Sequence, residues 1–87
     1  MAEFRWIAWN REHIARHGVT PEEVEWVVAH PALGYPRKHR DGYVVWEQSR
    51  SGRWLQVAFA RDRASSRVRL FVHHARPLTE TEKRRLR

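Results

Sequence analysis

Residues 43–74 read "YVVWEQSRSGRWLQVAFARDRASSRVRLFVHH", and this stretch decides the fold. It contains three runs, 43–48, 53–61 and 67–74, in which apolar side chains alternate with other residues, as in half-buried strands. The turn sequences "SRSG" and "DRASS" between them have the length of hairpin loops. We therefore expect an antiparallel meander, in a sheet of three to four strands.

Two short helices are predicted before this sheet. "FRWIAW" (4–9) reads as a short strand or an anchoring segment. In the following "NREHIARHG", Asn10 is an N-cap residue and Gly18 suits the left-handed conformation after a helix end. "TPEEVEWVVAHP" (20–31) then has a capping box, a proline in its first turn and a closing proline. The two helices are expected to meet at "HGVT".

A third helix is predicted at the C-terminus. In "PLTETEKRRLR" (77–87), Thr79 and Glu82 have the spacing of a second capping box. "ALGYPRKHRDG" (32–42) reads as a loop. The order of elements predicts a single α+β domain spanning residues 1–87, with the helices on one face of the sheet. The other face would be lined by Trp54, Gln56, Arg67 and Arg69, with His73 as a further candidate.

The composition excludes several kinds of protein. The chain has no cysteine, so it has neither disulfides nor a thiolate site, which fits the cytoplasm. Its charged N-terminus is neither a signal peptide nor a membrane span. Residues 1–43 hold six basic and six acidic side chains, whereas residues 44–87 hold eleven and four. The net charge of +7 therefore lies in the second half, which favours a polyanionic or acidic partner.

Four segments, in this order, resemble the BrnT-type toxins of bacterial type II toxin–antitoxin systems. They are "FRW" (4–6), "RHGVTPEEVEWV" (16–27), "SGRWLQVAFA" (51–60) and "HARPLTETEKRRL" (74–86). The resemblance implies a RelE-like ribonuclease fold and a toxin that inhibits translation by cleaving RNA. It also implies a BrnA-type antitoxin of the ribbon-helix-helix class, with operator DNA bound only through that antitoxin.

Metal-independent RNA cleavage by 2′-hydroxyl attack needs proton transfer and a cation at the phosphate, so it requires no cofactor. His74 is expected to transfer protons and Arg76 to bind the phosphate, with Lys83 closing the site. Two structural alternatives stay open, a backbone hydrogen bond for His74 and a salt bridge from Arg76 to Glu80 or Glu82. Residues predicted to bind RNA are Arg53, Trp54, Arg67, Arg69 and Arg84.

The remaining histidines are assigned other roles. His17 is interpreted as a helix-capping residue. His13 and His17 have the i, i+4 spacing of two zinc ligands, but no third ligand motif accompanies them, so no metal site is expected. His39 lies in a basic loop that would touch RNA.

The five tryptophans receive two explanations. Trp6, Trp9 and Trp26 are expected in the core, and Trp46 and Trp54 flank the first hairpin. Trp54 would stack on a base, receive an apolar antitoxin side chain, or simply pack at the sheet edge.

The chain departs from the family's usual residues at Ile7, His74 and Leu86. These departures keep a second function open, that of a non-catalytic module that binds nucleic acid or protein with the same basic face. Loss of cleavage in an Arg76→Ala variant would separate the two functions.

Overall fold

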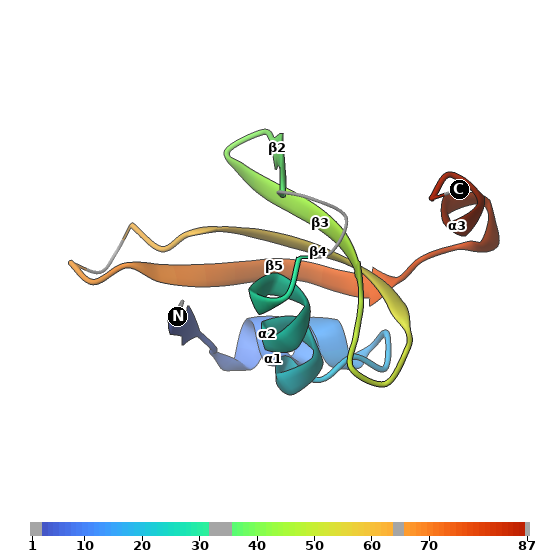
Figure 1. Cartoon of the computed structure of the whole chain (residues 1–87). Helices are drawn as coiled ribbons and strands as arrows, with labels where there is room; N and C mark the ends of the chain where they lie inside the picture. The colour runs from blue at the N-terminus through green and yellow to red at the C-terminus, as the bar shows by residue number, and fades with distance from the viewer. Residues whose placement is uncertain (1–2, 32–35, 64–65, 87) are drawn as a thin grey trace.

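The described part of the chain forms one mixed sheet with three helices (Figure 1). The structure, a computed structural model, describes residues 3–31, 36–63 and 66–86. The strands are β1 (Glu3–Arg5), β2 (Arg37–His39), β3 (Gly42–Gln48), β4 (Trp54–Arg61) and β5 (Arg69–Pro77). The helices are α1 (Ala8–Ala15), α2 (Pro21–Ala29) and α3 (Glu80–Arg84). The α+β class expected from the sequence is therefore confirmed.

The sheet is larger than predicted and is not wholly antiparallel. Its order is β1-β5-β4-β3-β2, in which β2 to β5 pair antiparallel and β1 pairs parallel with β5. The prediction of a three- to four-stranded antiparallel sheet is wrong in these respects. β1 and β2 have only three residues each, and β2 is exposed throughout. Neither strand carries the apolar alternation that identifies a strand in a sequence, and β2 forms within the segment predicted as a loop.

Strand β5 begins and ends later than predicted. The predicted run covered residues 67–74, but β5 starts at Arg69 and continues to Pro77. The predicted alternation places Val68 on one face with Leu70 and Val72, yet Val68 precedes the strand and is 64% exposed. Ala75, beyond the predicted end, is fully buried. The longer strand places both His74 and Arg76 on the sheet itself.

A β-bulge interrupts the pairing of β4 with β5. Phe59 pairs with Val72, whereas the preceding Ala58 pairs with His74, so His73 has no partner on β4. A bulge resets the alternation of side chains between the two faces of a strand. If the alternation of side chains is counted along the sequence from Val72, it therefore assigns His74, Ala75 and Arg76 to the wrong faces of the sheet.

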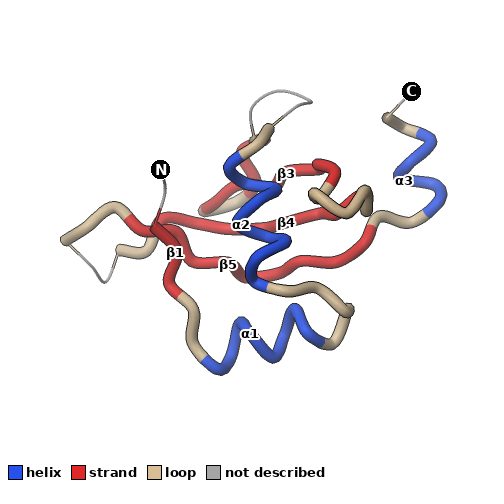
Figure 2. Tube along the Cα trace, turned by 60° about the horizontal axis from the view of Figure 1, so that its bottom comes forward, coloured by secondary structure: helices blue, strands red, loops and turns tan. Residues whose placement is uncertain are grey.

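Helix α2 crosses β3 and β4 on one face of the sheet, and α1 lies along β5 at the margin of the sheet (Figure 2). Ile14 of α1 enters the core, whereas Trp9, His13 and His17 contact β5 side chains of the other face. The core between these helices and the sheet is formed by Ile14, Val19, Val24, Val27, Val45, Leu55, Val57, Phe59, Val72 and Ala75. We call the opposite face the open face. It carries the side chains that alternate with the buried ones on β3, β4 and the second half of β5, namely Val44, Trp46, Trp54, Gln56, Ala58, Ala60, His74 and Arg76.

The helix ends agree with the sequence signals, with one exception. Thr20 accepts the backbone N–H of Glu23 at 3.2 Å, and Thr79 accepts that of Glu82 at 3.1 Å, which confirms both capping boxes. Asn10 is not the N-cap of α1, because Ile7 has that position. The Asn10 side chain instead accepts the Ile7 backbone N–H at 2.8 Å from within the first turn.

One tryptophan lies outside the expected core. Trp6 and Trp26 are partly buried, but Trp9 is 54% exposed. The Trp9 ring stacks on Phe71 with ring centroids 6.1 Å apart. Because α1 lies along β5, its Trp9 side faces away from the core that Ile14 enters.

Candidate functional site

The two residues predicted to carry the chemistry lie side by side on the open face. His74 is the register partner of Ala58, and Arg76 is that of Gln56. Both therefore point away from the buried Leu55 and Val57 side chains. The common side-chain direction expected for His74 and Arg76 is present because β5 remains regular from His74 to Pro77.

Three imidazoles meet at this position. The ring centroid of His74 lies 5.5 Å from that of His17 and 5.8 Å from that of His13, and the two α1 rings are 6.3 Å apart. We call these three residues the histidine cluster. The spacing of His13 and His17 on one helix face is visible in the sequence, but the approach of His74 is not, because it depends on α1 lying along β5.

The surroundings of His74 favour its neutral form. Burial lowers the pKa of His74 below the usual 6.5, and the nearby His17, Arg76 and His13 lower it further. A neutral imidazole has one free lone pair and can accept a proton. His74 is therefore suited to act as a general base near neutral pH.

Arg76 is already paired, and the salt bridge that the sequence left open is the one present. Its Nη1 donates to one carboxylate oxygen of Glu82 at 2.7 Å, and its Nη2 donates to the other at 2.8 Å. Further bonds reach the Pro77 carbonyl at 3.1 Å and the Gln56 side chain at 3.3 Å. Gln56 in turn accepts the indole N–H of Trp46 at 2.9 Å. A phosphate that binds the Arg76 fork must therefore compete with Glu82.

This pairing affects both partners. The hydrogen bonds from Arg76 and from the Thr79 backbone hold the pKa of Glu82 at about 2, below its usual 4.5. The hydrogen bond to Glu82 raises the pKa of Arg76. Both groups are therefore charged at neutral pH, and the pair fastens α3 to the end of the sheet.

We expect a Glu82→Gln variant to lose a pH dependence of stability. A carboxylate whose pKa falls from 4.5 to about 2 on folding stabilises the protein fully above pH 4.5. That contribution is lost as the pH falls from 4.5 towards about 2. Over this range, the free energy of unfolding measured in urea should fall more steeply for the parent than for the variant. Glutamine retains the capping box, so α3 should still form.

Glu80→Gln is the control for this comparison, because Glu80 is an exposed residue of the same helix and its one ion pair with a described residue is to Lys83 at 3.1 Å. Its pH dependence should follow that of the parent. Equal slopes for the parent and Glu82→Gln would contradict the assigned pairing.

The other predicted RNA-binding arginines of β5 lie at the far end of that strand from Arg76. Arg69 pairs with Asp62 at 3.2 Å, and Arg67, just before the strand, pairs with Glu3 at 3.3 Å. Asp62 is also 3.8 Å from Arg5. These ion pairs hold the β1 edge against the β4–β5 hairpin, and they partly neutralise the positive charge there.

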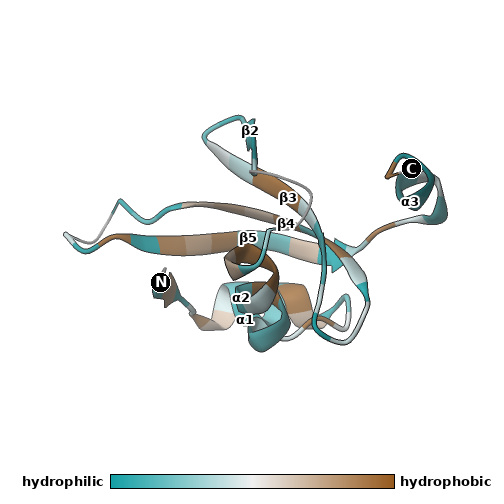
Figure 3. Ribbon diagram, in the orientation of Figure 1, coloured by the Kyte–Doolittle hydropathy of each residue, from teal (hydrophilic) through white to brown (hydrophobic). Residues whose placement is uncertain are grey.

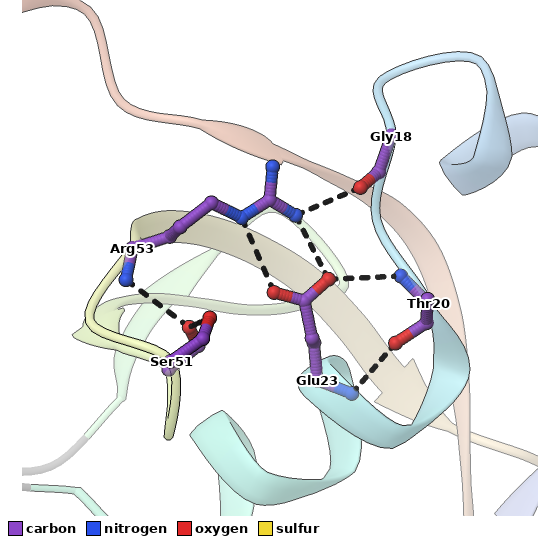
Figure 4. Close-up of polar contacts among 6 residues, drawn as sticks. Gly18, Thr20, Glu23, Ser51 and Arg53 are labelled. Atoms are coloured by element: carbon purple, nitrogen blue, oxygen red, sulfur yellow. Dashed lines mark hydrogen bonds and ion pairs between the residues drawn. The ribbon is translucent and has the colours of Figure 1, made fainter.

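Arg53 occupies a structural position on the helix side of the sheet (Figure 4). It donates to both carboxylate oxygens of Glu23, at 3.2 and 2.8 Å, and to the Gly18 carbonyl at 2.8 Å. Glu23 also closes the capping box of α2 by accepting the Thr20 N–H. Arg53 thus joins the α1–α2 junction to the start of β4, and its contact with RNA stays a prediction.

Replacing Arg53 with methionine should destabilise the protein by about 1–3 kcal/mol, because charge-assisted hydrogen bonds are lost and Glu23 loses its partner. Urea unfolding measures this change. Arg63→Met, at an exposed turn residue, should stay within about 0.5 kcal/mol of the parent. RNA affinity should be equal in the two folded variants. Weaker RNA binding in Arg53→Met alone would show that Arg53 contacts RNA as predicted.

Of the remaining predicted residues, Arg84 is exposed, whereas Lys83 and Trp54 are half-buried. Lys83 and Arg84 are on α3, and Arg84 makes no ion pair with any described residue. Trp54 is partly buried, and the alternation along β4 places it with Gln56 on the open face, as expected. These three residues and the Arg76–Glu82 pair form one end of the open face.

A further group of cations lies in the segment that the sequence predicts as a basic loop touching RNA. Arg37, Lys38 and Arg40, on β2 and its turn, are exposed and make no ion pair with the described part of the chain. We call them the basic arm, and Figure 3 shows the hydrophilic β2 at the edge of the sheet next to β3 and the largely hydrophilic α3 beyond the end of β5. The sequence signal was the run "RKHR" before Asp-Gly, which is itself a hairpin signal.

Comparison with known proteins gives no independent identification. No protein-family model matches the chain, and neither the curated proteins nor the solved structures contain a match. Within the described ranges, no set of three or more His, Asp or Glu side chains is arranged to hold a metal ion. None of the described helices is long and apolar enough to cross a bilayer.

Proposed function

We propose that this protein is a metal-independent endoribonuclease with a RelE-like fold, acting as the toxin of a BrnT-type toxin–antitoxin system. The observation that carries the proposal is the convergence of three imidazoles beside an arginine on an open, basic face. The order of helices and strands, the closing "HARPLTETEKRRL" segment and the concentration of arginine support the same assignment.

In the proposed reaction, His74 accepts the proton of a ribose 2′-hydroxyl. The 2′-oxygen attacks the adjacent phosphorus, and the bond from phosphorus to the 5′-oxygen breaks. His17, whose ring is 5.5 Å from that of His74, donates a proton to the leaving 5′-oxygen. The products are a 2′,3′-cyclic phosphate and a 5′-hydroxyl. Two imidazoles are sufficient for both proton transfers because each can accept or donate.

Positive charge would stabilise the phosphorane between these two steps. Arg76 is the nearest predicted cation, and it can reach a phosphate oxygen when the RNA displaces Glu82. The basic arm and Arg84 would bind phosphates on either side, since Arg37, Lys38, Arg40 and Arg84 have no ion pairs with described residues. The RNA strand would then cross the open face from β2 to α3.

The test is cleavage of a labelled single-stranded RNA by the purified protein in excess chelator. We expect cleavage that leaves a 2′,3′-cyclic phosphate, and no cleavage where the 2′-hydroxyl before the scissile phosphate is replaced by hydrogen. RNA binding without cleavage would contradict the proposal for free RNA. The same assay with programmed ribosomes then tests for ribosome-dependent cleavage, and its absence there would overturn the enzymatic assignment.

The cellular setting proposed is that of the family. The toxin would act on RNA in the cytoplasm and inhibit translation. A ribbon-helix-helix antitoxin of the BrnA type would cover the open face, and it would supply all contacts to operator DNA. Co-expression with an antitoxin from a neighbouring gene should restore growth if the chain is toxic alone.

A non-catalytic binding module is the second candidate. The observation in its favour is that Glu82 and two carbonyl groups occupy four N–H groups of Arg76. In that case the open face would bind RNA with a steep salt dependence, without chemistry at His74.

A further inference from the structure

A hollow beside the histidine cluster has no role in the proposed cleavage chemistry. Its volume is about 280 Å³, and it lies between the β2–β3 turn and the middle of β4 and β5. Its lining is formed by His39, Arg40, Asp41, Gly42, Tyr43, Ala58, Phe59, Ala60 and His73. Ala58 pairs with His74, so the hollow begins one strand away from the proposed general base.

The backbone fixes the shape of this hollow. A Cβ atom on Gly42 would lie 2.4 Å from the Phe59 carbonyl oxygen. Only glycine, which has no Cβ atom, therefore lets the start of β3 lie this close to β4. The bulge at His73 supplies a further wall. Ala58 and Ala60 keep the space open, because both are small. The hollow is therefore present before any ligand binds.

The lining suits a flat, uncharged ring with polar edges. His39 and His73 supply imidazole rings to the lining, and both are exposed. Arg40 supplies hydrogen-bond donors and Asp41 supplies acceptors, which are the groups that read base edges. Binding pockets for drug-sized ligands start at about 300 Å³, so this space fits a single base.

The charge next to the hollow indicates that the base belongs to a nucleic-acid strand. Arg37 and Lys38 precede the lining residues His39 and Arg40 on the basic arm. Proteins that bind single strands combine ring stacking for the bases with cations that follow the phosphates. Both features occur here within one hairpin and its neighbours.

We propose that this hollow binds one unpaired nucleobase of a single-stranded RNA, next to the phosphate at the histidine cluster. The inference rests on the proposed function and specifies which part of the substrate the open face recognises. The base held here would set the sequence preference of cleavage.

The experiment measures binding of a short fluorescent RNA whose 2′-hydroxyls are all methylated, so that it cannot be cleaved. A series of these RNAs lacks the base at one position at a time. For the parent, loss of the base at one position should weaken binding about tenfold, as expected for one stacked base. In Ala58→Leu, which fills the hollow, the same loss should have little further effect.

Ala29→Leu is the matched control, because it makes the same change at an exposed position on α2, on the other side of the sheet. It should behave like the parent. His73→Leu provides a second test if Ala58→Leu does not fold, since it removes an exposed ring from the lining and leaves the hollow open. Equal sensitivity to base loss in the parent and in the folded Ala58→Leu variant would overturn the proposal.

The result is independent of catalysis. Base-dependent binding without RNA cleavage would leave the hollow assigned and the ribonuclease proposal wrong. Cleavage without base-dependent binding would support the ribonuclease proposal and overturn the assignment of the hollow. DNA of the same sequence distinguishes the two kinds of strand, and binding of DNA as tight as that of RNA would overturn the assignment to RNA.

Discussion

A His74→Ala variant is expected to cleave RNA about 100- to 10,000-fold more slowly than the parent, the range typical for loss of a general acid or base. The imidazole is part of the histidine cluster and its pKa is lowered by burial, His17, Arg76 and His13, so it is the group best prepared to accept a proton. The rate constant is measured with saturating protein and trace labelled RNA in excess chelator.

The pH dependence gives a second readout. Because the pKa of His74 lies below 6.5, the rate of the parent should be retained down to that pH and should decline only below it. Arg76→Met removes one of the charges that lower the pKa, so the acidic decline should move to higher pH.

His30→Ala is the control, because His30 is an exposed imidazole at the end of α2 that contacts the Trp26 carbonyl. It should cleave at the rate of the parent. His74→Ala should keep the thermal midpoint of the parent within a few degrees, since His74 is only partly buried. Equal rates for His74→Ala and the parent would remove His74 from the reaction.

A Leu55→Ala variant is expected to lose about 2–5 kcal/mol of unfolding free energy. Leu55 is fully buried at the centre of the core, and it lies on β4, which pairs with two neighbouring strands. A domain of this length has about 4–13 kcal/mol of stability in total, so the loss is a large part of it. Urea unfolding of the parent and the variant measures the difference.

Val68→Ala removes apolar atoms at a residue that is 64% exposed, and it should change stability by less than about 0.5 kcal/mol. The contrast between the two variants tests which face of the sheet is packed. A loss below about 1 kcal/mol in Leu55→Ala would show that the core differs from the one described.

The sequence predicted the features that depend on neighbours along the chain. Both capping boxes are present, and β3 and β4 match the predicted runs to within one residue at each end. β1 and β2 were not predicted as this pair of edge strands, because three residues are too few to show alternation. The bulge at His73 was missed because it arises from the pairing of two strands.

The candidate site was predicted only where it depends on residues that are close together in the sequence. His74 and Arg76 share a face because they are two residues apart on a regular strand. Their partners come from elsewhere in the chain, since α1 brings His13 and His17 while α3 brings Glu82. Arg53, Arg67 and Arg69 have acidic partners that charge counting does not identify. The basic arm has no acidic partner among the described residues, and the sequence predicts this segment as a basic loop that touches RNA.

The position of β5 has a consequence for the order in which the protein is made. β5 lies between β1 and β4 in the sheet, but it is the last strand to leave the ribosome. Until β5 has been made, α1 has no strand to lie along, and His13 and His17 lack His74, the third residue of the histidine cluster. A nascent or truncated chain that ends before residue 69 therefore lacks both the finished sheet and the complete histidine cluster. Assembly of the proposed site is thus delayed until synthesis of the domain is nearly complete.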